Sequence, residues 1–427
     1  MFGSWIRRVA FWSLDMLRGG KIKKHYVDIS DKMSGKITVD CALKDILKYV
    51  QLNVPFYQES NYKQLSDFPV INKKIIMENY ESFRSREFLH NEELHEVATS
   101  GSSGNPFHAF QNPDKRRRVI AELAYIHNSV GWKIGDRYVF LRAWTGHYNS
   151  IGFQQFKQNF IPIEVTKFDS KAMNKLRETL KNDKKIEVII GYASSLSELA
   201  LYMKKEGDKP DMFNIRVIIT DSDALTPEGK VNLESVFGCP VINRYDNEEQ
   251  GIIAFTKPYS DEFTINSASY YVEVLAMDGD YPAKPGEVGR IVITDMYNKA
   301  MAFVRYDTGD LAIAGSMDVR RCLTLKSLQG RTADVVYATD GTTVCSTTIN
   351  NYICDFYDVK KYQLVQKDVG VFELMLVCSN KSASVSKIEE NMRYLLGENI
   401  QLTLKFVDDI PSGKNGKYKP VINEMNI

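Results

Sequence analysis

Residues 99–106 read Thr99-Ser100-Gly101-Ser102-Ser103-Gly104-Asn105-Pro106, and this run is the most informative stretch of the chain. It lies between two apolar segments typical of strands, 94–98 and 107–110. Glycine lets the backbone turn sharply and approach a ligand closely. Consecutive N–H groups in such a turn form a concave site for anions, and the hydroxyl side chains add donors for phosphate oxygens. The run therefore predicts a phosphate-binding loop, with a flexible hairpin loop as the alternative.

The loop differs from a Walker A motif, which requires a lysine after its second glycine and then a helix. Here Asn105 and Pro106 follow Gly104, and the next segment is typical of a strand. A phosphate in this loop would be held by the loop's own donors, without help from a helix N-terminus.

Helical and strand patterns alternate on both sides of this loop. We expect helices at 40–58, 115–132, 170–182, 195–205 and 227–237, and strands at 138–143, 186–190, 215–220 and 241–244. Strands that alternate with helices are typical of a parallel, layered α/β sheet.

From 269 to 294 the helices end and β-type alternation replaces them. A hairpin at 362–377, a helix at 383–396 and a strand at 401–407 are expected after that. The predicted fold class is α/β. A large layered α/β body with a β-rich subdomain covers residues 1–330, and a small mobile α+β domain covers residues 331–427. The boundary between them lies near Gly330.

Composition narrows the class of protein. The 427 residues carry a formal net charge of +1, which argues against a nucleic-acid partner. No apolar run reaches the roughly 18 residues that span a bilayer. The six cysteines form no C-x-x-C pair. We therefore expect reduced core thiols in a cytoplasmic protein.

The first twenty residues contain an amphipathic pattern. Trp5, Val9, Trp12 and Met16 share one helical face, and arginines lie nearby. Asp15 interrupts the apolar stretch, which argues against a signal peptide. The expected structure is a helix docked on the protein's own surface. The alternative is a basic amphipathic helix on a membrane surface or against a partner.

Two acidic motifs follow predicted strands. The first is Tyr245-Asp246-Asn247-Glu248-Glu249-Gln250-Gly251, and the second is Arg305-Tyr306-Asp307-Thr308-Gly309-Asp310. Ligands of open α/β sheets bind at the carboxyl ends of strands. Carboxylates in the first motif could hold Mg²⁺ together with nucleotide phosphates, and Asp310 could accept hydrogen bonds from ribose hydroxyls. A solvated acidic loop and a hairpin turn are the respective alternatives.

Two further motifs are Gly330-Arg331-Thr332-Ala333-Asp334 and, near the C-terminal end, Pro411-Ser412-Gly413-Lys414-Asn415-Gly416-Lys417. Glycine beside charged residues suits a hinge. A lysine on a glycine-flexed loop can move into a distant site and neutralise phosphate oxygens. The alternatives are an inter-domain turn and a basic tail.

These five motifs, in this order, resemble those of the adenylate-forming superfamily, which contains acyl-CoA synthetases, adenylation domains and luciferases. Within it the chain is most similar to the phenylacetate–CoA ligase branch, and more narrowly to the CapK-type proteins of capsular polysaccharide biosynthesis. The residues that carry this narrower resemblance are Asn53-Val54-Pro55-Phe56-Tyr57, Phe68-Pro69-Val70, Gly191-Tyr192-Ala193-Ser194-Ser195 and 220–225.

The resemblance implies an AMP-forming ligase with two half-reactions. A carboxylic acid attacks the α-phosphate of ATP and yields an acyl-adenylate. The acyl group then passes to CoA, or to an amine in an amide ligase. The implied cofactors are ATP, Mg²⁺ and CoA. We also expect a homodimer and a cytoplasmic location. The alternative is contact with the inner face of the membrane through residues 1–20.

The resemblance also implies roles for single residues. Lys417 and Glu249 would be catalytic, and Glu249 would hold the metal. The acyl pocket would contain Trp144, Tyr148, Tyr192 and Ser194. The nucleotide would contact Thr99, Ser100, Gly101, Ser102, Ser103, Gly104, Tyr245, Asp246, Asp310 and Arg331.

Some positions depart from the family's motifs. Asn105 replaces a lysine, Asp246 replaces a glycine, and Ala333 stands where a hinge aspartate is common. These departures leave open a catalytically reduced binding component of a polysaccharide assembly complex. An amidase-type hydrolase, which also carries a Gly/Ser-rich loop, requires an upstream catalytic lysine and a longer glycine-serine run that we do not find.

Overall fold

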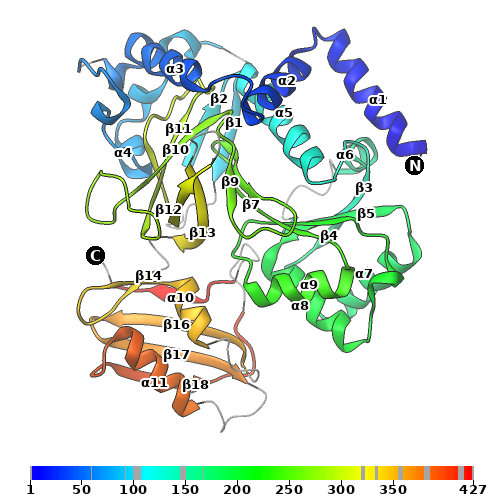
Figure 1. Cartoon of the computed structure of the whole chain (residues 1–427), viewed down its shortest axis with the longest axis vertical. Helices are drawn as coiled ribbons and strands as arrows, with labels where there is room; N and C mark the ends of the chain where they lie inside the picture. The colour runs from blue at the N-terminus through cyan, green and yellow to red at the C-terminus, as the bar shows by residue number, and fades with distance from the viewer. Residues whose placement is uncertain are drawn as a thin grey trace. The chain divides into compact units, whose positions relative to one another are not determined.

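The computed structural model describes residues 2–58, 60–91, 93–99, 107–144, 151–166, 168–318, 323–331, 335–353, 359–378, 385–411 and 418–425. The chain divides into two compact units (Figure 1). Unit 1 contains residues 1–308 and 313–327, and unit 2 contains residues 309–312 and 328–427.

An eleven-stranded sheet organises unit 1, in the order β10-β11-β12-β13-β9-β8-β7-β6-β5-β3-β4. One half is parallel and consists of β4 (Phe160–Glu164), β3 (Arg137–Arg142), β5 (Ile186–Tyr192), β6 (Val217–Asp221) and β7 (Val241–Asn247). These strands read as continuous apolar runs because helices cover both of their faces. The parallel sheet predicted from the alternating pattern is confirmed.

The other half of the sheet is built from hairpin-like connections rather than helices. It consists of β8 (Gly251–Thr256), β9 (Phe263–Ile265), β10 (Tyr270–Leu275), β11 (Val288–Asp295), β12 (Tyr306–Met317) and β13 (Leu323–Arg331). β8 runs antiparallel to both β7 and β9, so the sheet changes character at β7. This half is the β-rich subdomain that the sequence predicts.

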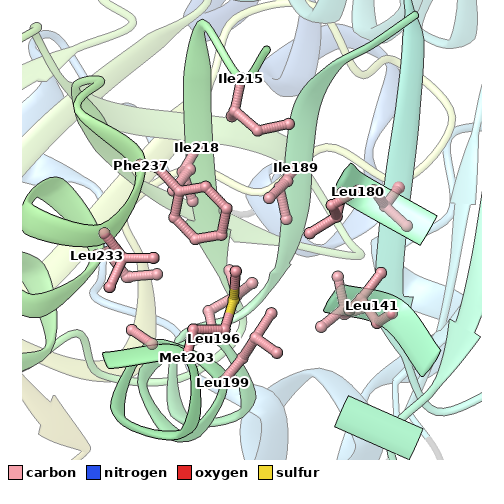
Figure 2. Packing of buried hydrophobic residues seen from close by; sticks show 14 of the residues in the cluster. Leu141, Leu180, Ile189, Leu196, Leu199, Met203, Ile215, Ile218, Leu233 and Phe237 are labelled. Atoms are coloured by element: carbon pink, nitrogen blue, oxygen red, sulfur yellow. The ribbon is translucent and has the colours of Figure 1, made fainter. Parts of the chain in front are cut away.

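Helices α7 (Ser170–Asn182), α8 (Ala193–Lys205) and α9 (Pro227–Phe237) cover one face of the parallel strands. Their apolar side chains pack against Leu141, Ile189 and Ile218 (Figure 2). Val188, Ile190, Val217 and Ile219 alternate with these positions and belong to a second cluster. Alternation along a strand sends neighbouring side chains to opposite faces, so the parallel half is covered on both sides.

Helix α5 (Pro113–Ser129) contributes Ile126 to that second cluster. Its first two turns carry the charge run Asp114-Lys115-Arg116-Arg117-Arg118, a sequence pattern that predicts a solvated helix face. This prediction is wrong for two residues of the run. Lys115 and Arg118 are fully buried. Lys115 pairs with Asp295 at 2.8 Å, and Arg118 reaches Asp28 of α2 (Lys21–Met33) at 2.5 Å. The charge run is therefore partly a buried polar network that ties α2 and α5 to the sheet.

A third core lies among residues 46–109 and 296–306. It includes α3 (Asp40–Asn53), the short helix α4 (Lys73–Glu78) and the hairpin β1 (His95–Thr99) and β2 (Phe107–Gln111). α3 ends at Asn53, five residues before the predicted end, because Pro55 cannot continue a helix. Unit 1 also contains α1 (Phe2–Leu17), α2, α6 (Ile151–Gln158) and strand β4. The sequence gives no clear signal for α2, α6 and β4.

Unit 2 is a small α+β domain. Its four-stranded sheet has the order β18-β17-β16-β19, from β16 (Val359–Asp368), β17 (Val371–Cys378), β18 (Gln401–Phe406) and β19 (Val421–Asn423). Helices α10 (Ser346–Ile353) and α11 (Val385–Leu396) share its core, and β14 (Val335–Tyr337) pairs with β15 (Thr343–Cys345). The hairpin, helix and strand predicted for this region are confirmed.

Candidate functional site

The carboxyl ends of the parallel strands lie in register. Leu141 of β3 is opposite Gly191 of β5, Gly191 is opposite Thr220 of β6, and Thr220 is opposite Asn243 of β7. A Cβ on Gly191 would lie 2.6 Å from the Leu141 carbonyl oxygen, so this close approach requires glycine. β3, β5 and β6 end one residue beyond this row, and β7 continues to Asn247. Open α/β sheets bind their ligands at this edge.

Glu249 is the central residue of the turn that joins β7 to β8. Its side chain is only 3% exposed, and Oε1 lies 3.1 Å from Nζ of Lys73. The Tyr306 hydroxyl donates to the same oxygen at 3.3 Å. The Glu249 backbone carbonyl accepts from Gln111 Nε2 at 3.0 Å. The carboxylate is thus held between a cation and a phenol from two distant parts of the chain.

Local structure fixes Lys73 beside this carboxylate. Asn72 caps α4 by accepting from the Ile75 N–H at 3.0 Å, which starts the helix at Lys73. Ile71 pairs with Tyr306 as an isolated parallel bridge, through hydrogen bonds to the backbone of Arg305 and Asp307. The backbone that carries Lys73 is therefore joined to the start of β12, and Tyr306 is the residue that links both to Glu249.

A second contact joins the two acidic motifs. The Tyr245 hydroxyl donates to Thr308 Oγ1 at 3.3 Å, and Thr308 Oγ1 donates to the Ile291 carbonyl at 3.1 Å. Tyr245 is 8% exposed. Motifs about sixty residues apart in the sequence therefore meet through both Glu249–Tyr306 and Tyr245–Thr308.

Asp246, which occupies the family's glycine position, belongs to a partly buried charge cluster. Arg244 contacts Asp246 at 2.8 Å and Asp221, the last residue of β6, at 2.7 Å. Burial raises the pKa of the Asp221 carboxyl to about 6, against the opposing effect of Arg244. Burial also lowers the pKa of His127, which lies 3.3 Å from Arg244.

Three predicted acyl-pocket residues lie at the same edge. Tyr192 ends β5, and Ser194 is in the first turn of α8, whose Ala193 N–H donates to Asp223 Oδ1 at 2.5 Å. Burial raises the pKa of the Tyr192 phenol, with Asp221 and Asp223 among the neighbouring charges. Trp144 donates from Nε1 to the Ile163 carbonyl at 3.2 Å and stacks on Phe160. Its indole is thus partly committed to packing beside β4.

Several predicted residues lie outside the described part of the chain. They are Ser100, Gly101, Ser102, Ser103, Gly104, Tyr148 and Lys417. Thr99 ends β1, Asp310 lies in β12 and Arg331 ends β13. The described residues therefore place the carboxylate and tyrosine part of the predicted site, together with the strands that flank the glycine-rich loop.

Within the described ranges, no group of three or more His, Cys, Asp or Glu side chains is arranged to hold a metal ion. Glu249 is a single buried carboxylate. Mg²⁺ usually keeps several waters and binds through one or two carboxylates plus substrate phosphates. The donor set therefore fits Mg²⁺ only as a nucleotide complex, with the Lys73 ammonium displaced from Oε1.

Sequence reasoning missed Lys73. The signal was present, because the family segment D-F-P-V-x-x-K ends in a lysine. Phe68-Pro69-Val70 matches that segment and Lys73 stands three residues further on.

The chain is similar to known ligases along most of its length. Residues 336–424 match the family model "CapK C-terminal domain". Protein CapK of Staphylococcus aureus is 23% identical, over 90% of this chain and 88% of that protein. The phenylacetate-coenzyme A ligase of Pseudomonas putida is 21% identical, over 82% of each chain.

Solved structures support the same fold. A 2-hydroxyisobutyryl-CoA ligase in the postadenylation state, bound to an acyl-AMP, superposes with a TM-score of 0.72 at 16% identity, over 90% of this chain and 89% of the ligase. The same ligase in an open conformation with 2-HIB-AMP and CoA gives a TM-score of 0.60. The phenylacetate-coenzyme A ligases among these relatives agree with the predicted enzyme class. The chain has the fold of the adenylate-forming acyl-CoA ligases and is a homologue of CapK and of the phenylacetate–CoA ligases.

Proposed function

We propose that the protein activates a carboxylic acid with ATP, forming an acyl-adenylate and pyrophosphate, and then transfers the acyl group to the thiol of CoA. The observation that carries this proposal is the meeting of the two acidic motifs at Glu249–Tyr306 and Tyr245–Thr308. The order of the motifs in the chain and the names of the relatives support it further.

The first half-reaction brings two anions together, so its barrier depends on neutralising charge at the phosphates. Each well-placed donor in such a site contributes roughly 10²–10³ in rate. Lys73 neutralises Glu249 without nucleotide and would turn to a phosphate oxygen when the nucleotide binds. Mg²⁺ bound at Glu249 would supply Lewis-acid neutralisation of the phosphate oxygens.

The remaining nucleotide contacts follow from the motifs. The loop 99–104 would hold the β- and γ-phosphates through its N–H and hydroxyl donors. Tyr245 would flank the adenine. Asp310 and Arg331 would hold the ribose.

The acid would bind at the ends of β5 and β6, beside Tyr192 and Ser194. This edge is charged: Asp221 Oδ1 and Arg244 Nε are buried and have no hydrogen-bond partner. A buried polar atom without a partner costs about 1–3 kcal/mol. A substrate with a hydroxyl or ammonium group would satisfy Asp221, so we propose a polar acid in preference to an unsubstituted aromatic one.

The second half-reaction requires the site to open for CoA. We propose that unit 2 is a lid that turns about residues 330–334 and carries Lys417 to the site for adenylation and away from it for acyl transfer. An amine in place of CoA would make the protein an amide ligase. The CapK similarity supports a role in capsular polysaccharide biosynthesis. A homodimer and a cytoplasmic location stay predictions.

One observation favours a second candidate, a binding component with reduced catalysis. Asp246 fills the glycine position and pairs with Arg244, which adds side-chain volume beside the proposed adenine site. ATP–pyrophosphate exchange with pooled aliphatic, hydroxy, amino and aromatic acids separates the two candidates. The proposed ligase exchanges label only when acid is present, whereas a binding component exchanges none. Thioester formation on addition of CoA then tests the acceptor.

A further inference from the structure

Helix α1 contacts the rest of unit 1 through its polar side and through Trp12, whose ring packs edge-on against Tyr26 of α2. Arg7 Nε donates to the Phe156 carbonyl at 3.1 Å, and Arg8 forms a 3.1 Å ion pair with Asp136. A Cβ on Gly135 would lie 2.4 Å from the Ser4 carbonyl oxygen, so glycine allows α1 to approach this turn closely. The helix is therefore docked on the body, as the sequence predicts, but of the expected apolar face Trp5, Val9 and Met16 are exposed, while Trp12 packs on α2.

The buried residue of α1 is a carboxylate. Among residues 3–17, only Asp15 has a buried side chain. Its carboxylate accepts hydrogen bonds from the backbone N–H groups of Ile22 at 3.0 Å and Lys23 at 2.9 Å, in the first turn of α2. These two hydrogen bonds fix the turn between the two helices and hold the orientation of α1.

The apolar side of α1 faces solvent. Trp5, Ile6, Val9, Met16 and Leu17 lie on this side and are 42–80% exposed. A groove runs along this side, lined by Trp5, Arg8, Val9, Trp12, Ser13 and Met16. A surface helix normally buries its apolar stripe against the core. A contiguous exposed stripe of this kind marks an interaction surface. Figure 1 shows α1, in dark blue, at the periphery of unit 1.

Positive charge is concentrated at the same place. Residues 1–24 contain six cations, Arg7, Arg8, Arg18, Lys21, Lys23 and Lys24, and one acid, Asp15, a net +5 in a chain whose net charge is +1. Asp136 neutralises Arg8 in an ion pair, so a net +4 stays on this part of the surface. Arg18, Lys21 and Lys24 are exposed just beyond the apolar stripe. A second copy would bring an equal positive charge to the same face, so repulsion disfavours pairing of two α1 helices. An anionic surface is complementary.

We propose that α1 docks this protein on an anionic membrane surface. Trp5, Val9 and Met16 enter the boundary between headgroups and acyl chains, and Arg18, Lys21 and Lys24 contact lipid phosphates. Within the described residues, no helix is long and apolar enough to cross a membrane. This docking would keep the proposed ligase close to products that are assembled at a membrane, but it does not depend on the ligase activity.

Flotation with lipid vesicles tests the proposal on the full-length protein. Wild type should float with vesicles of phosphatidylcholine and phosphatidylglycerol and not with phosphatidylcholine alone, and tryptophan emission should shift to the blue. Val9→Glu should reduce the partition coefficient roughly tenfold or more, and Lys21→Glu with Lys24→Glu should do the same. Val231→Glu is the matched control, because Val231 is a 63% exposed residue of α9 far from α1 in sequence.

Three results would overturn the proposal. Wild type could fail to float with the anionic vesicles. Val9→Glu could float as well as Val231→Glu. Sedimentation could show a wild-type dimer that Val9→Glu dissociates, with no lipid binding, which would assign the apolar stripe to a second copy. Circular dichroism of each variant checks that the fold is retained.

Discussion

The Lys73 ammonium lies 3.1 Å from the Glu249 carboxylate, although 176 positions separate the two residues in the chain. Lys73 is 39% exposed and Glu249 is 3% exposed, so the pair is open to solvent on the lysine side only. The Lys73 ammonium can therefore move into solvent, whereas the Glu249 carboxylate stays buried. Such a pair is suited to a site where a metal–nucleotide complex replaces the ammonium beside the carboxylate.

Lys73→Met should weaken both stability and ATP use. Without nucleotide, Glu249 keeps its bond from Tyr306 but loses its cation. We expect a loss of about 1–2 kcal/mol in the free energy of unfolding, less than for a fully buried pair because Lys73 is partly solvated. The KM for ATP should rise roughly tenfold. Urea unfolding and exchange kinetics measure these effects. Lys74→Met is the control, and equal effects from both variants would contradict the role given to Lys73.

Lys115→Met should destabilise unit 1 more strongly. Lys115 is fully buried and contacts Asp295 at 2.8 Å and the Tyr270 hydroxyl at 2.9 Å. Its removal leaves a buried carboxylate without a cation, which typically costs about 3–5 kcal/mol. Urea unfolding should show this loss, and Lys171→Met on the exposed side of α7 should change the free energy by less than about 0.5 kcal/mol. A cost below about 1 kcal/mol for Lys115→Met would show that the network is solvated.

Asp221→Asn should change how stability depends on pH. The pKa of Asp221 is raised from 3.8 to about 6 in the folded protein, so between those values the folded state keeps a proton that the unfolded state has lost. This group therefore lowers the free energy of unfolding as pH rises from about 4 to about 6, by up to about 3 kcal/mol.

The variant lacks this titration, so its stability relative to wild type should rise from pH 4 to pH 7. Urea unfolding at several pH values gives the difference. A constant offset between the two proteins across this range would mean that Asp221 titrates normally.

Lys417→Ala should separate the two half-reactions. If Lys417 acts on ATP during adenylation only, the variant loses acid-dependent pyrophosphate exchange by roughly 10²-fold or more but converts a supplied acyl-adenylate to the thioester at nearly the wild-type rate. Lys414→Ala is the control from the same loop. Equal loss of both half-reactions in Lys417→Ala would remove the lysine from its proposed role.

Much of the fold could be predicted because local and long-range preferences agree. The strands at Val188 and Ile218 are continuous apolar runs, and the helices between them have an apolar stripe of helical period. Strand β4 was missed because Pro162 and short length weaken its pattern, although an edge strand tolerates proline.

The site was only partly predictable for a different reason. Sequence motifs show which residues carry chemistry, but not which distant residues they contact. Lys73, Tyr306 and Glu249 meet because Ile71 pairs with β12, and nothing local to Lys73 indicates that pairing. In the same way, the charge run around Lys115 and Arg118 predicted solvent exposure, because the acids that pair with them, Asp295 and Asp28, belong to other elements.

The most direct test of the central claim is ATP–pyrophosphate exchange with the acid pool, in wild type, Glu249→Gln and Glu248→Gln. Glu248 is the exposed neighbour in the same turn, so the two variants differ in position but not in chemistry. The account predicts acid-dependent exchange in wild type and Glu248→Gln, and a loss of roughly 10²-fold or more in Glu249→Gln. Exchange that is equal in both variants, or absent from wild type while a phenylacetate–CoA ligase assayed in parallel is active, would contradict adenylation at Glu249.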